Sequence, residues 1–219
     1  MDNKNLPLAI LWDMDGVLVD TGQAHLTAWR ETLAQYGKHY SNEEFKATFG
    51  MNNASILRYV FGKDLDPGFV REVGDSKEVM FREIIKSGVR PLPGVLVWLE
   101  WFRTHSLKQA VASSAPCENI DALVDALGIR PFFDAIVSGA ELPGKPRPDV
   151  FLKAARLVGI PPKDCLVIED AVPGVQAARN AGMKCVAITT TNPAEGLQQA
   201  DLVLSDLTEL TEQQLAALF

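Results

Sequence analysis

Short, continuously apolar runs recur along the second half of this chain, and they constrain its fold more than any other feature. Each run is rich in Val, Ile or Leu without polar alternation, as in parallel strands that are covered on both faces. Helical patterns such as 118–127 and 172–181 separate the runs, and each ends at a glycine, as helices commonly do. This alternation predicts an α/β fold with one parallel sheet. The predicted strands are 8–12, 108–112, 135–137, 165–168, 185–188 and 202–204.

Residues 22–89 carry no convincing strand pattern. Ser41-Asn-Glu-Glu44 has the form of a capping box that begins a short helix. Pro91-Leu-Pro-Gly94 then interrupts the helical periodicity. We therefore expect an all-helical domain, residues 22–89, inserted into a discontinuous core of residues 1–21 and 90–219. Its predicted helices cover 23–36, a short segment after 41, 53–61 and 68–86.

Charge and cysteine content narrow the function classes. With 28 acidic and 21 basic residues the net charge is −7, which does not favour nucleic acid or an anionic membrane as a partner. Cys117, Cys165 and Cys185 lack metal-site spacing and are expected to be free thiols. No apolar run approaches the roughly 20 residues of a membrane span. We expect a cytoplasmic monomer that acts on a small molecule.

Charged and hydroxyl residues follow several of the predicted strands. Ligands bind at the carboxyl ends of strands in an open parallel sheet, so these residues should converge there. Four carboxylates beside one lysine leave a net formal charge of about −3, which a hard divalent cation such as Mg²⁺ would offset. The converging residues are Asp13, Asp15, Ser113, Ser114, Lys145, Glu169 and Asp170.

The spacing of the first two aspartates is suited to phosphoryl chemistry. If the first strand continued through them, Asp13 and Asp15 would point to one face and could address one reacting centre. One carboxylate can attack phosphorus and the other can protonate the leaving oxygen. Ser113-Ser114 precedes a predicted helix, whose first amide groups attract anions.

Four segments in order and spacing, "DMDGVLVDT", "VASSAP", "GKPRPDVF" and "VIEDAVPGVQAARNAGM", resemble the haloacid dehalogenase (HAD) superfamily. The resemblance is to its β-phosphoglucomutases and sugar phosphatases, and it implies a Rossmann-like core with an inserted helical cap that sets substrate specificity. It makes Asp13 the nucleophile that becomes an aspartyl phosphate, and Asp15 the acid and then the base. It also implies Mg²⁺ held by Asp13, Asp170, Glu169 and the main-chain carbonyl of Asp15, and phosphate held by Ser113, Ser114 and Lys145.

The predicted cap leaves the reaction open between two kinds of enzyme. Thr21 and His25 resemble β-phosphoglucomutase positions, but that mutase has an arginine where this chain has Asn53. The mutase must hold a bisphosphate, for which Lys77 or Arg58 would have to supply the cation. We therefore expect a phosphatase, with a β-phosphoglucomutase as the alternative and a catalytically silent phosphometabolite binder as a second alternative. Substrate contacts are expected from Thr21, His25, Asn52, Asn53 and Lys77.

Overall fold

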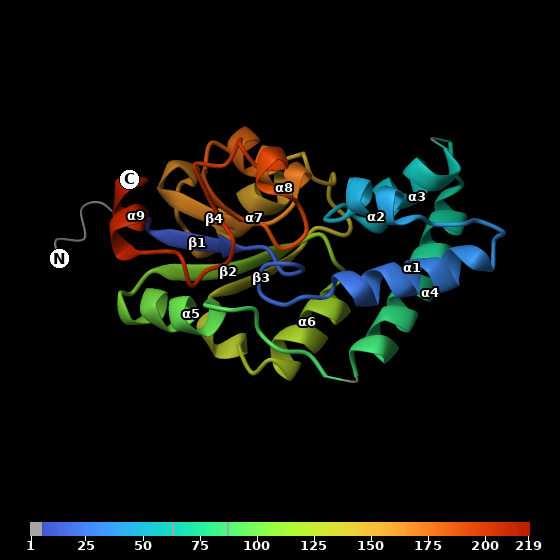
Figure 1. Ribbon diagram of the computed structural model, residues 1–219, viewed down its shortest axis with the longest axis horizontal. Coiled ribbons are helices and arrows are strands. Elements are labelled where there is room, and N and C mark those ends of the chain that lie inside the picture. The colour runs from blue at the N-terminus through green and yellow to red at the C-terminus, as the bar shows by residue number, and fades with distance from the viewer. Residues whose placement is uncertain (1–5, 63, 87) are drawn as a thin grey trace.

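A computed structural model describes residues 6–62, 64–86 and 88–219, and Figure 1 shows a sheet-containing core beside a group of helices. Residues 1–5, 63 and 87, which belong to the predicted segments 1–21 and 22–89, lie outside the described residues. Within the described residues the sheet has six parallel strands in the order β3-β2-β1-β4-β5-β6. The strands are β1 (Ala9–Trp12), β2 (Lys108–Ser113), β3 (Ala135–Ser138), β4 (Cys165–Glu169), β5 (Lys184–Ile188) and β6 (Leu202–Leu204).

The strands are buried on both faces, as their unbroken apolar character predicts. In β1, Ile10 and Trp12 pack into one core cluster with the helices on that face. Ala9 and Leu11 pack into a second cluster on the opposite face. The predicted α/β class and its six strands are confirmed, because only a doubly covered sheet buries both side-chain sets of one strand.

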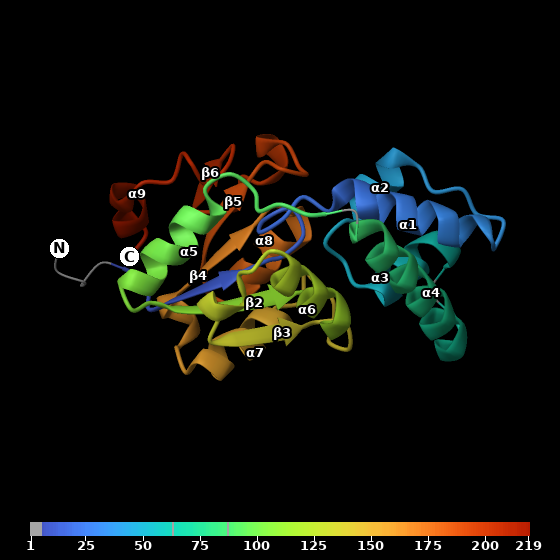
Figure 2. The ribbon, with the colours of Figure 1, turned by 90° about the horizontal axis from the view of Figure 1, so that it is seen from below.

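Helices cover both faces of this sheet, and they lie above and below it in Figure 1. One face is covered by α5 (Val95–Thr104), α6 (Cys117–Ala126) and α9 (Glu212–Ala217). The other is covered by α7 (Asp149–Val158) and α8 (Val172–Asn180). Figure 2 shows α5 running beside the sheet before the chain enters β2.

A separate cap is built from α1 (Gly22–Ala34), α2 (Asn42–Thr48), α3 (Asn53–Phe61) and α4 (Pro67–Ile85). The predicted capping box is present, since Ser41 and Glu44 bond each other's backbone N–H groups at the start of α2. The cap has its own apolar cluster, centred on Trp29, Leu33, Leu57 and Val73. The division at residues 21/22 and 89/90 stays a prediction, although the helices fall between those limits.

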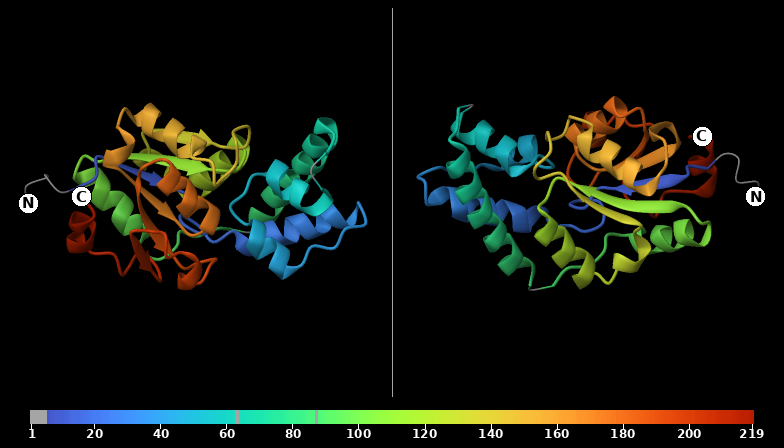
Figure 3. Two further views of the ribbon diagram at one scale, coloured as in Figure 1. Left: turned by 90° about the horizontal axis from the view of Figure 1, so that it is seen from above. Right: turned by 180° about the vertical axis from the view of Figure 1, so that it is seen from behind.

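Cap and core meet at the carboxyl ends of the strands, as both views of Figure 3 show. Asn119 on α6 joins them, donating to Glu78 on α4 at 2.5 Å and accepting from Arg82 at 2.8 Å. The Ser114 hydroxyl also donates to the Gly50 carbonyl, between α2 and α3, at 2.8 Å. These bonds hold the cap over the strand ends. Among the described residues, no helix has both the length and the apolarity to cross a membrane.

Candidate active site

The candidate site lies where the order of the strands reverses. The chain moves from β1 outward to β2 and β3, and then returns to the other side of β1 with β4. Such a reversal leaves a crevice at the carboxyl ends of the two central strands. Asp13 directly follows β1, and Glu169 and Asp170 lie at the end of β4. The three carboxylates are buried, with oxygen atoms within 4.8 Å of one another.

Lys145 occupies the centre of this carboxylate cluster. Its Nζ donates to Asp13 Oδ1 at 2.6 Å and to Glu169 Oε1 at 2.5 Å, and its side chain is fully buried. Burial alone would lower the pKa of Lys145, but the attraction of the two carboxylates outweighs it and raises that pKa. Lys145 therefore remains an ammonium and offsets one of the buried negative charges.

Asp170 has the clearest unmet demand for a ligand. Its Oδ1 is a buried oxygen with no hydrogen-bond partner in the part of the chain that the structure describes, while Oδ2 accepts from the Thr191 hydroxyl. Burial and the charges of Glu169 and Asp13 raise the pKa of Asp170 well above its usual value. A hard divalent cation would satisfy this oxygen and relieve the repulsion, so the residues present fit Mg²⁺.

Glu169 is the least available of these carboxylates for a metal. Its Oε2 accepts from the backbone N–H groups of Asp170 and Ala171, both at 2.8 Å, and its Oε1 accepts from Lys145. A Cβ on Gly174 would overlap the same carboxylate. Both oxygens of Glu169 are therefore engaged by the protein, which leaves Asp13 and Asp170 as the carboxylates better able to contact a metal directly.

Asp15 reaches the site by a turn and not by an extension of the strand. β1 ends at Trp12, and Asp15 lies in a loop that forms an isolated bridge with Val19. The strand therefore does not continue through the two aspartates, and Gly16 turns the chain directly after Asp15 with a φ of 86°. Both aspartates nevertheless line one pocket.

Two neighbours hold the carboxylate of Asp15. The Thr21 hydroxyl donates to Oδ1 at 2.5 Å, and His25 Nε2 lies 3.1 Å from the same oxygen. Burial would raise the pKa of Asp15, but His25, Thr21 and Lys77 together lower it. Asp13 differs: burial raises its pKa to about 7 against the opposing effect of Lys145. The two aspartates thus have environments that push their pKa values apart.

The protonation of His25 follows from its other neighbour. Lys77 Nζ lies 2.8 Å from His25 Nδ1, and an ammonium can only donate. Nδ1 therefore accepts, which leaves the proton on Nε2, where it donates to Asp15. Lys77 also donates to Glu78 Oε1 at 3.0 Å. A chain of hydrogen bonds thus runs from Asp15 through His25 to an ion pair on α4.

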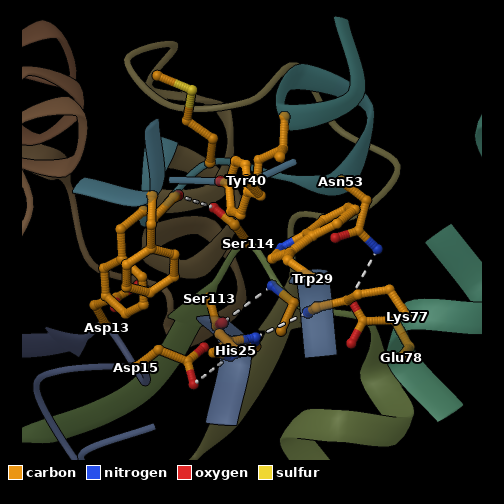
Figure 4. A pocket seen from close by; sticks show the side chains of 16 residues that line it. Asp13, Asp15, His25, Trp29, Tyr40, Asn53, Lys77, Glu78, Ser113 and Ser114 are labelled. Atoms are coloured by element: carbon orange, nitrogen blue, oxygen red, sulfur yellow. Dashed lines mark hydrogen bonds and ion pairs between the residues drawn. The ribbon is translucent and has the colours of Figure 1, made fainter. Parts of the chain in front are cut away.

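Ser113 and Ser114 lie on the core side of the same pocket. Ser113 ends β2, and its Oγ accepts from the Ala115 backbone N–H at 3.1 Å. The Ser114 hydroxyl is bonded to Gly50, so its backbone amide is the better candidate for an anion. Both serines face the two aspartates across the opening, which suits a phosphoryl group between them (Figure 4).

The cap supplies the opposite wall of this pocket, which encloses about 500 Å³, part of it open to solvent. Figure 4 shows Trp29, Lys77, Glu78 and Asn53 gathered on that side. Among the described residues, the polar members of the cap wall are His25, Asn53, Lys77 and Glu78, and the rest is aromatic or apolar. Its apolar members are Trp29, Tyr40, Phe45, Phe49, Met51 and Ile56.

The predicted cap residues are not all placed alike. His25, Asn53 and Lys77 line the pocket, whereas Thr21 contacts Asp15 from outside the lining. Asn52 also lies outside it: its Oδ1 accepts from Ser55 N at the start of α3, and its Nδ2 donates to the Leu142 carbonyl.

Two functional residues were missed from the sequence. Thr191 follows β5 at the same edge of the sheet, so the rule that found Ser113 would have found it. Glu78 had no comparable signal, because its role depends on the packing of α4 against α6.

The chain is similar in sequence and in fold to several known proteins. The sequence model of the family described as "Haloacid dehalogenase-like hydrolase" matches residues 10–188. The chain is 36% identical over 183 residues to the fructose-1-phosphate phosphatase YqaB of Escherichia coli, covering 82% of this chain and 95% of YqaB. It is 31% identical over 214 residues to the β-phosphoglucomutase of Bacillus subtilis, covering 93% and 91%.

A crystal structure of β-phosphoglucomutase from Clostridium difficile is similar in fold, with a TM-score of 0.88 at 24% identity, covering 97% of this chain and 98% of that one. Not every relative has this length. The matched part is 18% of the chloroplastic protein SUPPRESSOR OF QUENCHING 1 of Arabidopsis thaliana.

Proposed function

The chain belongs to the haloacid dehalogenase-like hydrolases and is an enzyme that acts on phosphate monoesters, and on this basis we propose a specific reaction. We propose that it is a Mg²⁺-dependent phosphatase of a small phosphorylated metabolite such as a sugar phosphate. One observation carries the proposal. Asp13 and Asp15 line a single pocket, with Asp13 bonded to a buried lysine and Asp15 to a histidine. Binding alone would not require this separation of two neighbouring carboxylates.

In the proposed reaction Asp13 attacks the phosphorus of the ester. Asp15 takes up a proton from solvent as the anionic substrate binds beside it, because the phosphate charge raises its pKa. The new bond joins an Asp13 oxygen to phosphorus, the bond between phosphorus and the leaving oxygen breaks, and Asp15 gives that oxygen its proton. Asp15, now ionised, accepts a proton from the water that attacks the aspartyl phosphate, and inorganic phosphate leaves. This uses one carboxyl group as acid and then as base. His25 and Thr21 orient it through Oδ1.

The other core residues offset the negative charge of the phosphoryl group and of Asp13. Lys145, with the Ser113 hydroxyl and the Ser114 amide, would hold the phosphoryl oxygens and offset the charge of Asp13. Mg²⁺, held by Asp13, Asp170 and the main-chain carbonyl of Asp15, would supply further neutralisation of the phosphoryl charge. The partnerless Oδ1 of Asp170 supports this assignment. The cap covers one side of the site and would limit the access of bulk water to the phosphoryl group.

The hydrolase reaction is favoured over the mutase reaction by the charges of the cap. A mutase intermediate carries a second phosphate, which needs a cation in the cap. Asn53 stands where the mutase pattern has arginine, Arg58 is exposed outside the pocket lining, and Lys77 is paired with Glu78. The mutase remains the alternative, since the Bacillus subtilis relative carries that name at 31% identity.

The test is phosphate release from a panel of sugar phosphates with and without Mg²⁺, with isomerisation of β-glucose 1-phosphate assayed in parallel. We expect Mg²⁺-dependent phosphate release without isomerisation. Isomerisation faster than phosphate release would establish the mutase instead. Binding of panel members without any turnover would favour the silent binder and overturn the proposal.

A further inference from the structure

The cap wall of the pocket combines aromatic rings with one neutralised ion pair, and the mechanism above does not use this pair to contact substrate. Four aromatic side chains, Trp29, Tyr40, Phe45 and Phe49, lie on the side from which the leaving group would be held. Flat apolar rings favour the C–H faces of an uncharged molecule over a hydrated anion. The net charge of this wall therefore determines whether the site binds an uncharged or an anionic leaving group.

Lys77 is the one cationic side chain among the described residues that line the pocket. Its Nζ is 3.0 Å from Glu78 Oε1 and 2.8 Å from His25 Nδ1. It also lies over the rings of Trp29 and Phe81, at 5.4 Å and 5.1 Å from their centroids. Its charge is balanced and its donors are directed at protein groups, so it offers little to a second anion.

Glu78 is held firmly in the position that balances Lys77. Asn53 donates to its Oε1 at 2.7 Å, and Asn119 of the core donates to its Oε2 at 2.5 Å. Its side chain is 6% exposed. The attraction of Lys77 and the bonds from its neighbours keep the pKa of Glu78 low although burial opposes them. Glu78 is thus a fixed negative charge in the wall.

We propose that this wall selects phosphate monoesters with an uncharged leaving group, and that Glu78 is the specificity-determining residue that rejects a second phosphate or a carboxylate on the substrate. An added anion would meet the buried carboxylate of Glu78 at close range, because Glu78 lines the pocket. Lys77 could attract such an anion only by giving up Glu78. This inference rests on the proposed phosphatase function and names the substrate class of the same site.

The experiment uses a matched pair of compounds, glycerol 3-phosphate and 3-phosphoglycerate, which differ in a hydroxymethyl group against a carboxylate. Each is measured as a competitive inhibitor of p-nitrophenyl phosphate hydrolysis by the Mg²⁺-loaded protein, so that neither needs to be turned over. We expect 3-phosphoglycerate to inhibit at least about tenfold more weakly. Equal or stronger inhibition by 3-phosphoglycerate in the unmodified protein would overturn the inference without any variant.

The variant Glu78→Gln leaves Lys77 unbalanced while keeping the shape of the side chain. Its amide keeps one acceptor oxygen, so only one of the donors Asn53 and Asn119 retains its acceptor. It should reduce the preference for glycerol 3-phosphate by about tenfold or reverse it. Glu83→Gln is the matched control, because Glu83 is an exposed residue of α4 whose partner is Lys86, and it should leave the preference unchanged. An unchanged preference in Glu78→Gln, or an equal change in Glu83→Gln, would contradict the role of Glu78.

Failure to hydrolyse p-nitrophenyl phosphate or any sugar phosphate would instead remove the phosphatase function itself.

Discussion

The hydrogen bonds made to Asp15 Oδ1 determine the pKa and the orientation of this carboxylate. Its Oδ1 accepts from both Thr21 and His25, and these neighbours keep its pKa low in spite of burial. An acid that must return to being a base gains from such partners, because they stabilise the ionised form that activates water.

The variant Thr21→Val removes one of these donors with little change of shape. The pKa of Asp15 should rise and its carboxylate should lose part of its orientation, so kcat near neutrality should fall roughly threefold to tenfold, while the acidic limb of the profile, which the higher pKa of Asp13 sets, should stay in place. Thr27→Val on the same helix is the control, since Thr27 accepts only from Gln23 in an exposed contact. A kcat near neutrality that matches that of Thr27→Val would rule out the role of the Thr21 hydroxyl.

Gly16 is needed for two separable reasons. Its φ of 86° strains any side chain, and a Cβ there would overlap the Asp170 carboxylate. Gly16→Ala should therefore abolish most activity and weaken Mg²⁺ binding, in addition to a cost of about 1–3 kcal/mol in the free energy of unfolding. Gly37→Ala has a similar positive φ of 67° but no atom within 4 Å of its Cβ. It should lose stability alone, and equal activities of the two variants would contradict this account.

At the scale of helices and strands, α4 and α6 are joined across the cap–core boundary by one buried residue. Asn119 is fully buried and links Glu78 to Arg82 through its amide. Asn119→Ala would leave a buried carboxylate and a guanidinium short of a partner. It should reduce the free energy of unfolding by about 1–3 kcal/mol, as measured by urea denaturation. Asn180→Ala, whose exposed side chain donates to the Pro146 carbonyl, should change it little. A comparable loss in both variants would mean that Asn119 makes no special link.

The strands and the core site were predictable because both depend on local pattern. Buried strands are apolar without a break, and the residues that follow them, such as Ser113 and Glu169, meet at one edge of the sheet. The helix α5 (Val95–Thr104) was not predicted, because no helix was assigned between Gly94 and the strand expected at 108–112. An apolar stretch of this length is ambiguous between helix and strand without its surroundings.

The cap was predictable in class but not in detail. Its helices follow from periodicity and from the Ser41 capping box, whereas the pairing of Lys77 with Glu78 depends on how α4 meets α1 and α6. Neighbours in sequence on a helix do not normally face each other. Here both side chains turn into the pocket, and only the packed structure could show this.

At the scale of the whole molecule, the buried carboxylates make the free energy of unfolding depend on pH and on bound Mg²⁺. Burial raises the pKa of Asp13 from 3.8 to about 7, and that of Asp170 is raised as well. The folded protein then holds protons that the unfolded chain releases, so this contribution to stability is lost as pH rises from about 4 to about 7. Mg²⁺ must displace those protons, so its affinity should increase over the same range.

We therefore expect the increase in Tm on adding Mg²⁺ to be larger at about pH 8 than at about pH 5. The comparison is made with and without metal at each pH, since the lowered pKa values of Asp15 and Glu78 act on stability with the opposite sign. A larger increase in Tm at the acidic pH would contradict a metal bound by these carboxylates.

The central claim, that Asp13 takes the phosphoryl group, is tested most directly by trapping it there. The variant Asp15→Asn would be incubated with Mg²⁺ and p-nitrophenyl phosphate carrying a radiolabelled phosphoryl group, whose leaving group departs without a proton from Asp15, then quenched in acid and digested. The account predicts an acid-stable, hydroxylamine-labile label on the peptide that contains Asp13, and its loss in the double variant with Asp13→Asn. A label on any other residue, or turnover by Asp13→Asn at a tenth or more of the unmodified rate, would contradict it.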